Sequence, residues 1–191
     1  MMQLLKCKKA GYTLVEVLIV VSIMGILSSM GVVSLRAAVA NSRVKDAAIN
    51  TSAFLERVAN LSKERSDLIC LAIDPTSAQT LLAVKSVGSD CSTANKMGGG
   101  ILDKLVIDAP TKFVQNSSAT CNFVGDIDMT KSSDAVIKPR IGLSAVPHGI
   151  VCVQYDNDDR FGIARKAQGY NNVKAFWKIG NSDGANGWIE L

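Results

Sequence analysis

The chain has 191 residues, of which 48% are hydrophobic, 20% are charged and four are proline. This length suits one domain with a core, or one domain with an appendage, and the composition excludes a wholly disordered or low-complexity chain. The formal net charge of +4, from 21 Lys and Arg against 17 Asp and Glu, points to an acidic partner only if the excess lies in the folded region.

Residues 12–35 form an apolar segment that contains a single charged residue, Glu16. At about 1.5 Å per residue, roughly 20 apolar helical residues cross the hydrocarbon core of a bilayer, so this segment is long enough to span it. Three lysines at 6, 8 and 9 precede the segment, and the positive-inside tendency predicts a single pass with a cytoplasmic N-terminus. An ordinary secretory signal is disfavoured, because the apolar run is too long and continues into further helix.

A carboxylate inside an apolar span calls for an explanation, since an ionisable group at membrane depth is costly and rare without a partner or a role. The residues around Glu16 read KKAGYTLVE at positions 8–16, followed by the apolar stretch. This sequence resembles the type IV prepilin signature: a short basic leader, Gly, an often aromatic residue, Thr-Leu, any residue and Glu. It departs from that pattern only in having Tyr12 where Phe is commonest.

The resemblance implies a processing pathway and an assembly role. Residues 1–11 would be a leader that an inner-membrane prepilin peptidase removes by cutting after Gly11, with methylation of the new amine on Tyr12. Glu16 would pair with the N-terminal amine of a neighbouring subunit during assembly. Other pilin or pseudopilin subunits, the peptidase and the inner membrane are the partners that this resemblance implies.

Residues 36–66 are rich in Ala, Leu, Glu, Lys and Arg and lack Gly and Pro, which predicts that the helix continues. Apolar residues recur at steps of three or four and form one face, namely Val44, Ala47, Ala48, Phe54, Leu55 and Val58. A solvated coiled-coil stalk is one interpretation of this amphipathic stretch. Docking onto a globular domain is favoured, because the face mixes Ala with large residues rather than following a clean heptad.

Residues 67–191 have the alternation and the turn-rich spacing of short strands. The expected strands are 67–73, 80–87, 101–107, 120–127, 135–143, 149–155, 160–165, 173–179 and 187–191. A long N-terminal helix followed by strands predicts the α+β class, with the helix packed on an antiparallel sheet or small sandwich. We expect this β-rich globular domain to be periplasmic or extracellular.

Five cysteines are present, and Cys7 would leave with the leader. The other four, Cys70, Cys91, Cys121 and Cys152, form an even set in a domain expected outside the cytoplasm, which predicts disulfides. Three pairings are possible, and nearness favours Cys70 with Cys91 and Cys121 with Cys152. A zinc site is disfavoured because there is no CxxC and no pair of histidines.

Enzyme motifs are weak in this sequence. The one histidine, His148, lies in a Pro-His-Gly turn, and neither a nucleophile elbow nor a phosphate loop occurs. Asp156, Asp158 and Asp159 could bind calcium, but they lack the spacing of a calcium loop and read better as a hairpin turn. We therefore expect no enzyme activity, no cofactor and no metal.

A set of basic residues in the last third has aromatic residues interleaved, the combination that contacts phosphates and stacks on bases. The set is Arg160, Arg165, Lys166, Lys174 and Lys178, with Tyr170, Phe176 and Trp177. The competing interpretation is a solvated strand face with core aromatics.

The function expected from these observations is a structural subunit of a type IV pilus or pilus-like secretion filament, either a minor pilin or a type II secretion pseudopilin. The alternative is a tip minor pilin that binds DNA or acts as an adhesin. In both cases the protein would sit in the inner membrane before assembly and in a periplasmic or cell-surface filament afterwards. Loss of the leader leaves 18 Lys and Arg against 17 Asp and Glu, so the net charge of the mature chain argues for no acidic partner.

Overall fold

The computed structural model describes residues 12–115, 121, 126–167, 172–180 and 187–191. The chain divides into two compact units, a helical extension that ends at Val39 and a globular part from Ala40 to Leu191. Helix α1 (Leu14–Arg65) contributes residues to both units. It ends where Ser66 takes a left-handed backbone conformation with φ of 57°, and Lys63 and Arg65 lie in its last turn, where positive charge suits the helix dipole.

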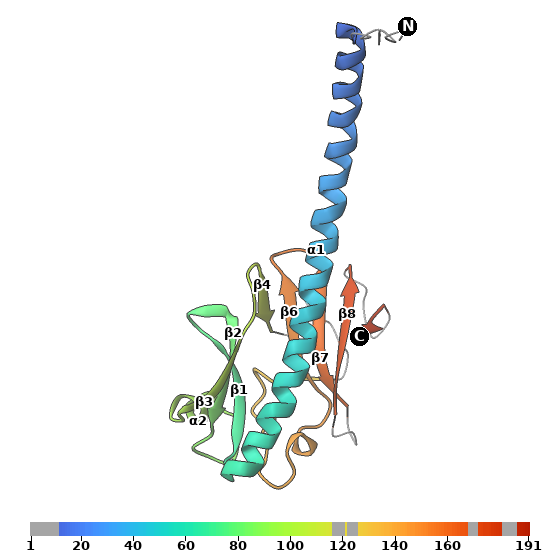
Figure 1. Cartoon of the computed structure of the whole chain (residues 1–191). Coiled ribbons are helices and arrows are strands. Elements are labelled where there is room, and N and C mark those ends of the chain that lie inside the picture. Colours follow the sequence, from blue (N-terminus) through green and yellow to red (C-terminus); the bar gives the residue numbers. More distant parts are fainter. Residues whose placement is uncertain (1–11, 116–120, 122–125, 168–171, 181–186) are drawn as a thin grey trace, which may run out of the picture. The chain divides into compact units, whose positions relative to one another are not determined.

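Residues 40–65 of α1 pack against the strands of the globular part, as expected for an amphipathic helix that docks (Figure 1). All six apolar residues of the predicted face are buried, and Val44, Ala48, Leu55 and Val58 have no exposed surface. The prediction of docking is therefore confirmed, and the stalk interpretation is wrong.

The strands form two sheets. Sheet A is antiparallel in the order β1-β2-β3, with bounds β1 (Ile69–Asp74), β2 (Ser77–Lys85) and β3 (Ile101–Val106). Sheet B has the order β4-β6-β7-β8-β9, with bounds β4 (Thr111–Val114), β6 (Gly149–Tyr155), β7 (Arg160–Lys166), β8 (Val173–Ile179) and β9 (Ile189–Glu190). The short β5 (Ile127–Asp128) pairs with β6 in parallel, and the helices α2 (Thr93–Met97) and η1 (Leu143–Ala145) lie in connections. The predicted α+β class is confirmed.

One main core lies between α1 and both sheets, and the two-residue period of the strands decides which side chains enter it. In β6, Val151 and Val153 belong to this core, whereas Ile150 and Cys152 belong to a second cluster on the opposite face of sheet B. Gly162 lies where α1 crosses β7. A Cβ there would lie 3.0 Å from both the Cβ of Ala48 and the carbonyl oxygen of Val44.

One predicted strand does not appear, and a second lies mostly outside the described residues. Residues 135–143 form turns with two isolated bridges, Ile69 to Ile137 and Lys138 to Gly142, so the strand prediction is wrong there. Four apolar residues of this stretch, Ala135, Val136, Ile137 and Leu143, are buried by loop packing instead of by ladder pairing. Of the described positions of the predicted strand 120–127, Ile127 lies in β5 and positions 121 and 126 do not lie in a strand, whereas positions 120 and 122–125 are outside the described residues. The sequence interpretation also missed β4 and α2.

Two disulfides join Cys70 to Cys91 and Cys121 to Cys152, the pairing that nearness in the sequence favours. Cys70 and Cys91 lie in a small apolar cluster with Val136, apart from the main core. The second disulfide lies in the cluster on the outer face of sheet B. Each bridge therefore ties a connecting segment to a sheet face that α1 does not cover.

Candidate functional site

The start of α1 is closed by reciprocal hydrogen bonds between Thr13 and Glu16. The backbone N–H and the hydroxyl of Thr13 each donate to Oε2 of Glu16 at 3.0 Å, and the backbone N–H of Glu16 donates to Oγ1 of Thr13 at 3.2 Å. This is a capping box, in which the first turn satisfies backbone donors that have no partner within the helix. The carboxylate of Glu16 is thereby held beside Thr13, the residue after Tyr12.

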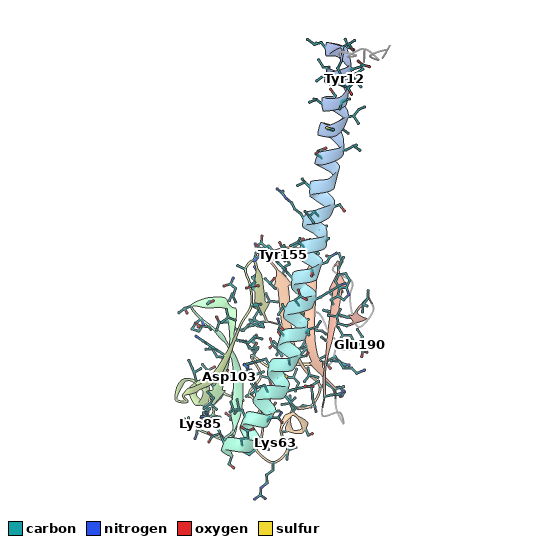
Figure 2. The ribbon with its side chains drawn as sticks, viewed as in Figure 1. Tyr12, Lys63, Lys85, Asp103, Tyr155 and Glu190 are labelled. Carbon is teal, nitrogen blue, oxygen red and sulfur yellow. A yellow bond between two sulfur atoms is a disulfide. The ribbon has the colours of Figure 1, made fainter. Side chains whose placement is uncertain are left out.

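The helical extension has an apolar surface on all sides. Its described large apolar side chains are exposed, from 80% for Leu14 to 40% for Val39, and Figure 2 shows side chains that project to both sides of the helix near Tyr12. An 18-residue window of α1 has a mean hydropathy of 2.3, so the helix is long and apolar enough to cross a membrane. A helix that is apolar all round needs lipid or other apolar helices as its surroundings.

Tyr12 is 85% exposed at the end of this extension, and the predicted cleavage bond precedes it. Gly11 and the rest of the leader lie outside the described residues. Cleavage at that bond would turn the backbone nitrogen of Tyr12 into a free ammonium, four residues before the carboxylate of Glu16. The arrangement thus offers one positive and one negative group at the end of an otherwise apolar helix.

The sequence interpretation did not recognise Thr13 as the N-terminal cap of α1. A Thr followed three residues later by Glu, just before an apolar run, is the sequence signature of a capping box. The signal was therefore present in positions 13–16.

The five basic residues predicted to contact nucleic acid do not form one surface. Strand alternation places Arg160 and Lys166 on the α1 side of sheet B, where the Nε of Arg160 donates to Asn41 at 2.8 Å. Arg165 belongs to the opposite face, together with Lys174 and Lys178. Positions that are close in sequence thus point to different sides of the sheet.

These cations are also engaged within the fold. Lys166 and Lys178 are each only 1% exposed. Lys166 donates to the carbonyl of Val146 at 2.6 Å, and its burial lowers the pKa of its ammonium below the ordinary 10.5. Lys178 lies 4.8 Å from the ring centroid of Trp188. The burial of both ammonium groups gives no support to the prediction that Lys166 and Lys178 contact phosphates.

The other three basic residues of the predicted nucleic-acid surface have carboxylate partners. Arg165 pairs with the buried Asp126 at 2.5 Å, Lys174 pairs with Glu190 at 2.7 Å, and Arg160 pairs with Asp158. Of the interleaved aromatics, Phe176 and Trp177 are half-buried, and Tyr170 lies outside the described residues.

The residues considered for calcium binding and for catalysis lie in a turn and beside an ion pair. Residues 156–159 form the hairpin turn between β6 and β7, as expected. The Nδ1 of His148 lies 3.8 Å from Asp126, the carboxylate that also holds Arg165. Across the described residues, no group of three His, Cys, Asp or Glu side chains is arranged to hold a metal ion.

Comparison with known proteins gives one match. Residues 6–32 match the family model described as the prokaryotic N-terminal methylation motif. A search of curated proteins and a search of solved structures found no match to the chain. The matched range contains Gly11, Tyr12, Thr13 and Glu16, together with most of the exposed apolar helix. The chain therefore carries the prepilin signature of type IV pilin-like proteins at its N-terminus.

Proposed function

We propose that this protein is a structural, non-enzymatic subunit of a type IV pilus or pilus-like secretion filament, as a minor pilin or a pseudopilin. The observation that carries the proposal is the methylation motif on an apolar helix whose first turn holds a single carboxylate. Prepilin peptidase removes residues 1–11, and the mature chain begins at the methylated amine of Tyr12. The other subunits of the filament are its assembly partners.

Glu16 gives the assembly its register in this proposal. Before assembly, its carboxylate caps its own helix through Thr13. Within an assembled apolar core, it pairs with the Tyr12 amine of a neighbouring subunit, and the two opposite charges compensate each other's loss of water. Removing one partner of such a pair typically costs about 3–5 kcal/mol, because the other charge stays buried and unpaired.

Before assembly, the helical extension anchors the protein in the inner membrane with its N-terminus in the cytoplasm. The lysines of the leader favour this orientation. The globular part then lies outside the cytoplasm, where the two disulfides persist.

Mass spectrometry of the full-length gene product from cells with and without prepilin peptidase tests the processing step. We expect a chain that begins at Tyr12 with a methylated amine in the first cells, and the complete leader in the second. An N-terminus at Met1 in both strains would contradict the proposal.

The Glu16→Gln variant tests the register role, because it keeps the shape of the side chain and removes its charge. We expect normal processing but loss of the variant from the sheared filament fraction. Ser22→Ala is the matched control, since the Ser22 hydroxyl only donates to the carbonyl of Leu18 in its own helix. Equal incorporation of the Glu16→Gln variant and the control would show that the charge is not needed.

A further inference from the structure

Four exposed cations gather where α1 ends, and none has a partner among the described residues. Most lysines and arginines of the globular part are engaged, as in the pairs Arg57 with Asp103 and Lys85 with Asp67. Exposed Lys104 and Lys131 also have no hydrogen-bond or ion-pair partner among the described residues, but four other exposed cations gather where α1 ends and form what we call the basic end: Lys63, Arg65, Lys138 and Arg140. Glu64, between Lys63 and Arg65, is an exposed carboxylate in the same turn, so the basic end keeps a net positive charge. Charges without an internal partner are available to an external one.

Hydrogen bonds of the fold join the two segments that carry the basic end. The backbone N–H of Gly142 donates to the carbonyl of Lys138 at 2.6 Å and closes the turn that carries Arg140. The hydroxyl of Ser62 lies 3.3 Å from the carbonyl of Ile137, which joins this turn to the last turns of α1. Ile141, beside Arg140, is 51% exposed and adds an apolar contact to the charged surface.

A second set of unpaired charges, of opposite sign, lies in the loops beside the first globular turns of α1. It consists of the exposed carboxylates of Asp108, Asp156 and Asp159, which we call the acidic end. The backbone N–H of Asp156 donates to the carbonyl of Pro110 at 3.0 Å, which brings the two loops together. The cations close to them are engaged elsewhere: Arg43 donates to the carbonyl of Ala109, and Lys112 donates to Asn157.

The two ends lie at opposite extremes of the globular part. On α1, Arg43 contacts the loop of Asp108 at the acidic end, and Lys63 lies beside Gly142 at the basic end. These two residues are 20 positions apart, which corresponds to about 30 Å of helix. In Figure 2, Tyr155, next to Asp156, and Lys63 mark the two extremes. A molecule with opposite charges at its two ends can stack head to tail, and such a heterologous contact repeats into a filament.

We propose that the basic end of the globular part docks against the acidic end of a second copy of this chain. The inference rests on the proposed function as a filament subunit and names the partner of its globular part. Because the contacts are exposed ion pairs, they weaken as salt rises.

Cysteine cross-linking of the full-length chain in cells tests the contact directly. A chain with Arg140→Cys and Asp159→Cys carries one new thiol at each end, while the four cysteines of the globular part stay in disulfides and Cys7 leaves with the leader. We expect a ladder of disulfide-linked dimers and higher oligomers under mild oxidation. The matched control carries Lys104→Cys, on β3, with Asp159→Cys. Absence of a ladder, or an equal ladder in the control, would overturn the proposal.

Charge reversal tests the electrostatic basis. Lys138→Glu with Arg140→Glu, or Asp108→Lys with Asp159→Lys, should each lower copy-to-copy association about tenfold, and combining all four changes should restore it. The control is Lys104→Glu with Lys174→Glu, which makes the same charge change on the strands. If each reversal weakens association and the combination does not restore it, the partner is another molecule, such as an acidic polymer, and the proposal fails.

The filament fraction separates this inference from the proposed function. A ladder in membranes without incorporation of the wild-type chain into filaments would refute the proposed function alone. Incorporation of the wild-type chain without a ladder would refute the end-to-end contact alone.

Discussion

Replacing Gly162 by alanine is expected to destabilise the globular part by about 1–3 kcal/mol through overpacking. The added Cβ would lie 2.9 Å from Cγ2 of Val153 and 3.0 Å from both the Cβ of Ala48 and the carbonyl oxygen of Val44. Ordinary carbon contacts lie at about 3.5–4.0 Å, so α1 and β7 must separate by roughly half an ångström or more. The oxygen belongs to the helix backbone, which cannot move aside as a side chain can.

Urea unfolding of the full-length chain in detergent, followed by tryptophan fluorescence, measures this change. Gly100→Ala is the matched control, because a Cβ there meets nothing within 4 Å, and we expect its stability to change by less than about 0.5 kcal/mol. Alanine suits a strand better than glycine, so local preference alone would make Gly162→Ala stabilising. Equal stabilities for the two variants would refute the argument that α1 needs a glycine at this crossing.

Three further predictions concern the same part of the chain. Burial lowers the pKa of Lys166 in the folded chain, so the unfolded chain binds more protons as the pH approaches 10.5. The free energy of unfolding should therefore rise with pH in this range. Lys166→Met should flatten that rise in unfolding free energies measured from pH 7 to 10. Replacing Cys70 and Cys91 together by serine should cost about 3 kcal/mol, because the bridge closes a loop of 21 residues, and urea unfolding against the oxidised wild type checks it. Ser62 is buried and donates to the carbonyl of Asp67 at 2.7 Å, so Ser62→Ala should cost about 1–2 kcal/mol in the same assay, and no loss would mean that the bond is dispensable.

Local signals in the sequence identified the long helix α1 and the longer strands. The buried face of α1 followed from a periodicity that needs no knowledge of the partner strands. The strands at 149–155, 160–165 and 173–179 were predicted to within one residue because each is an alternating run bounded by turn residues. The strand prediction for 135–143 was wrong because a loop that buries apolar residues can show the same run of apolar positions as a strand.

The basic residues of the last third show where sequence proximity fails. Arg165 and Lys166 are adjacent, yet one side chain pairs with Asp126 and the other is buried against Val146. Meanwhile Lys63 and Arg140 are 77 positions apart and belong to the same basic end. Neither relation can be seen before the sheets and the turn 138–142 are in place.

The N-terminal prepilin signature was readable from the sequence because every feature that defines it lies within one continuous segment. The leader, Gly11, Tyr12, the capping pair and the apolar run are set by neighbours along the chain, and a membrane responds to that segment as a linear element. The globular surface was decided only by tertiary structure. Its charges become available or unavailable according to which carboxylate, carbonyl or ring lies across from them, and those partners come from distant parts of the chain.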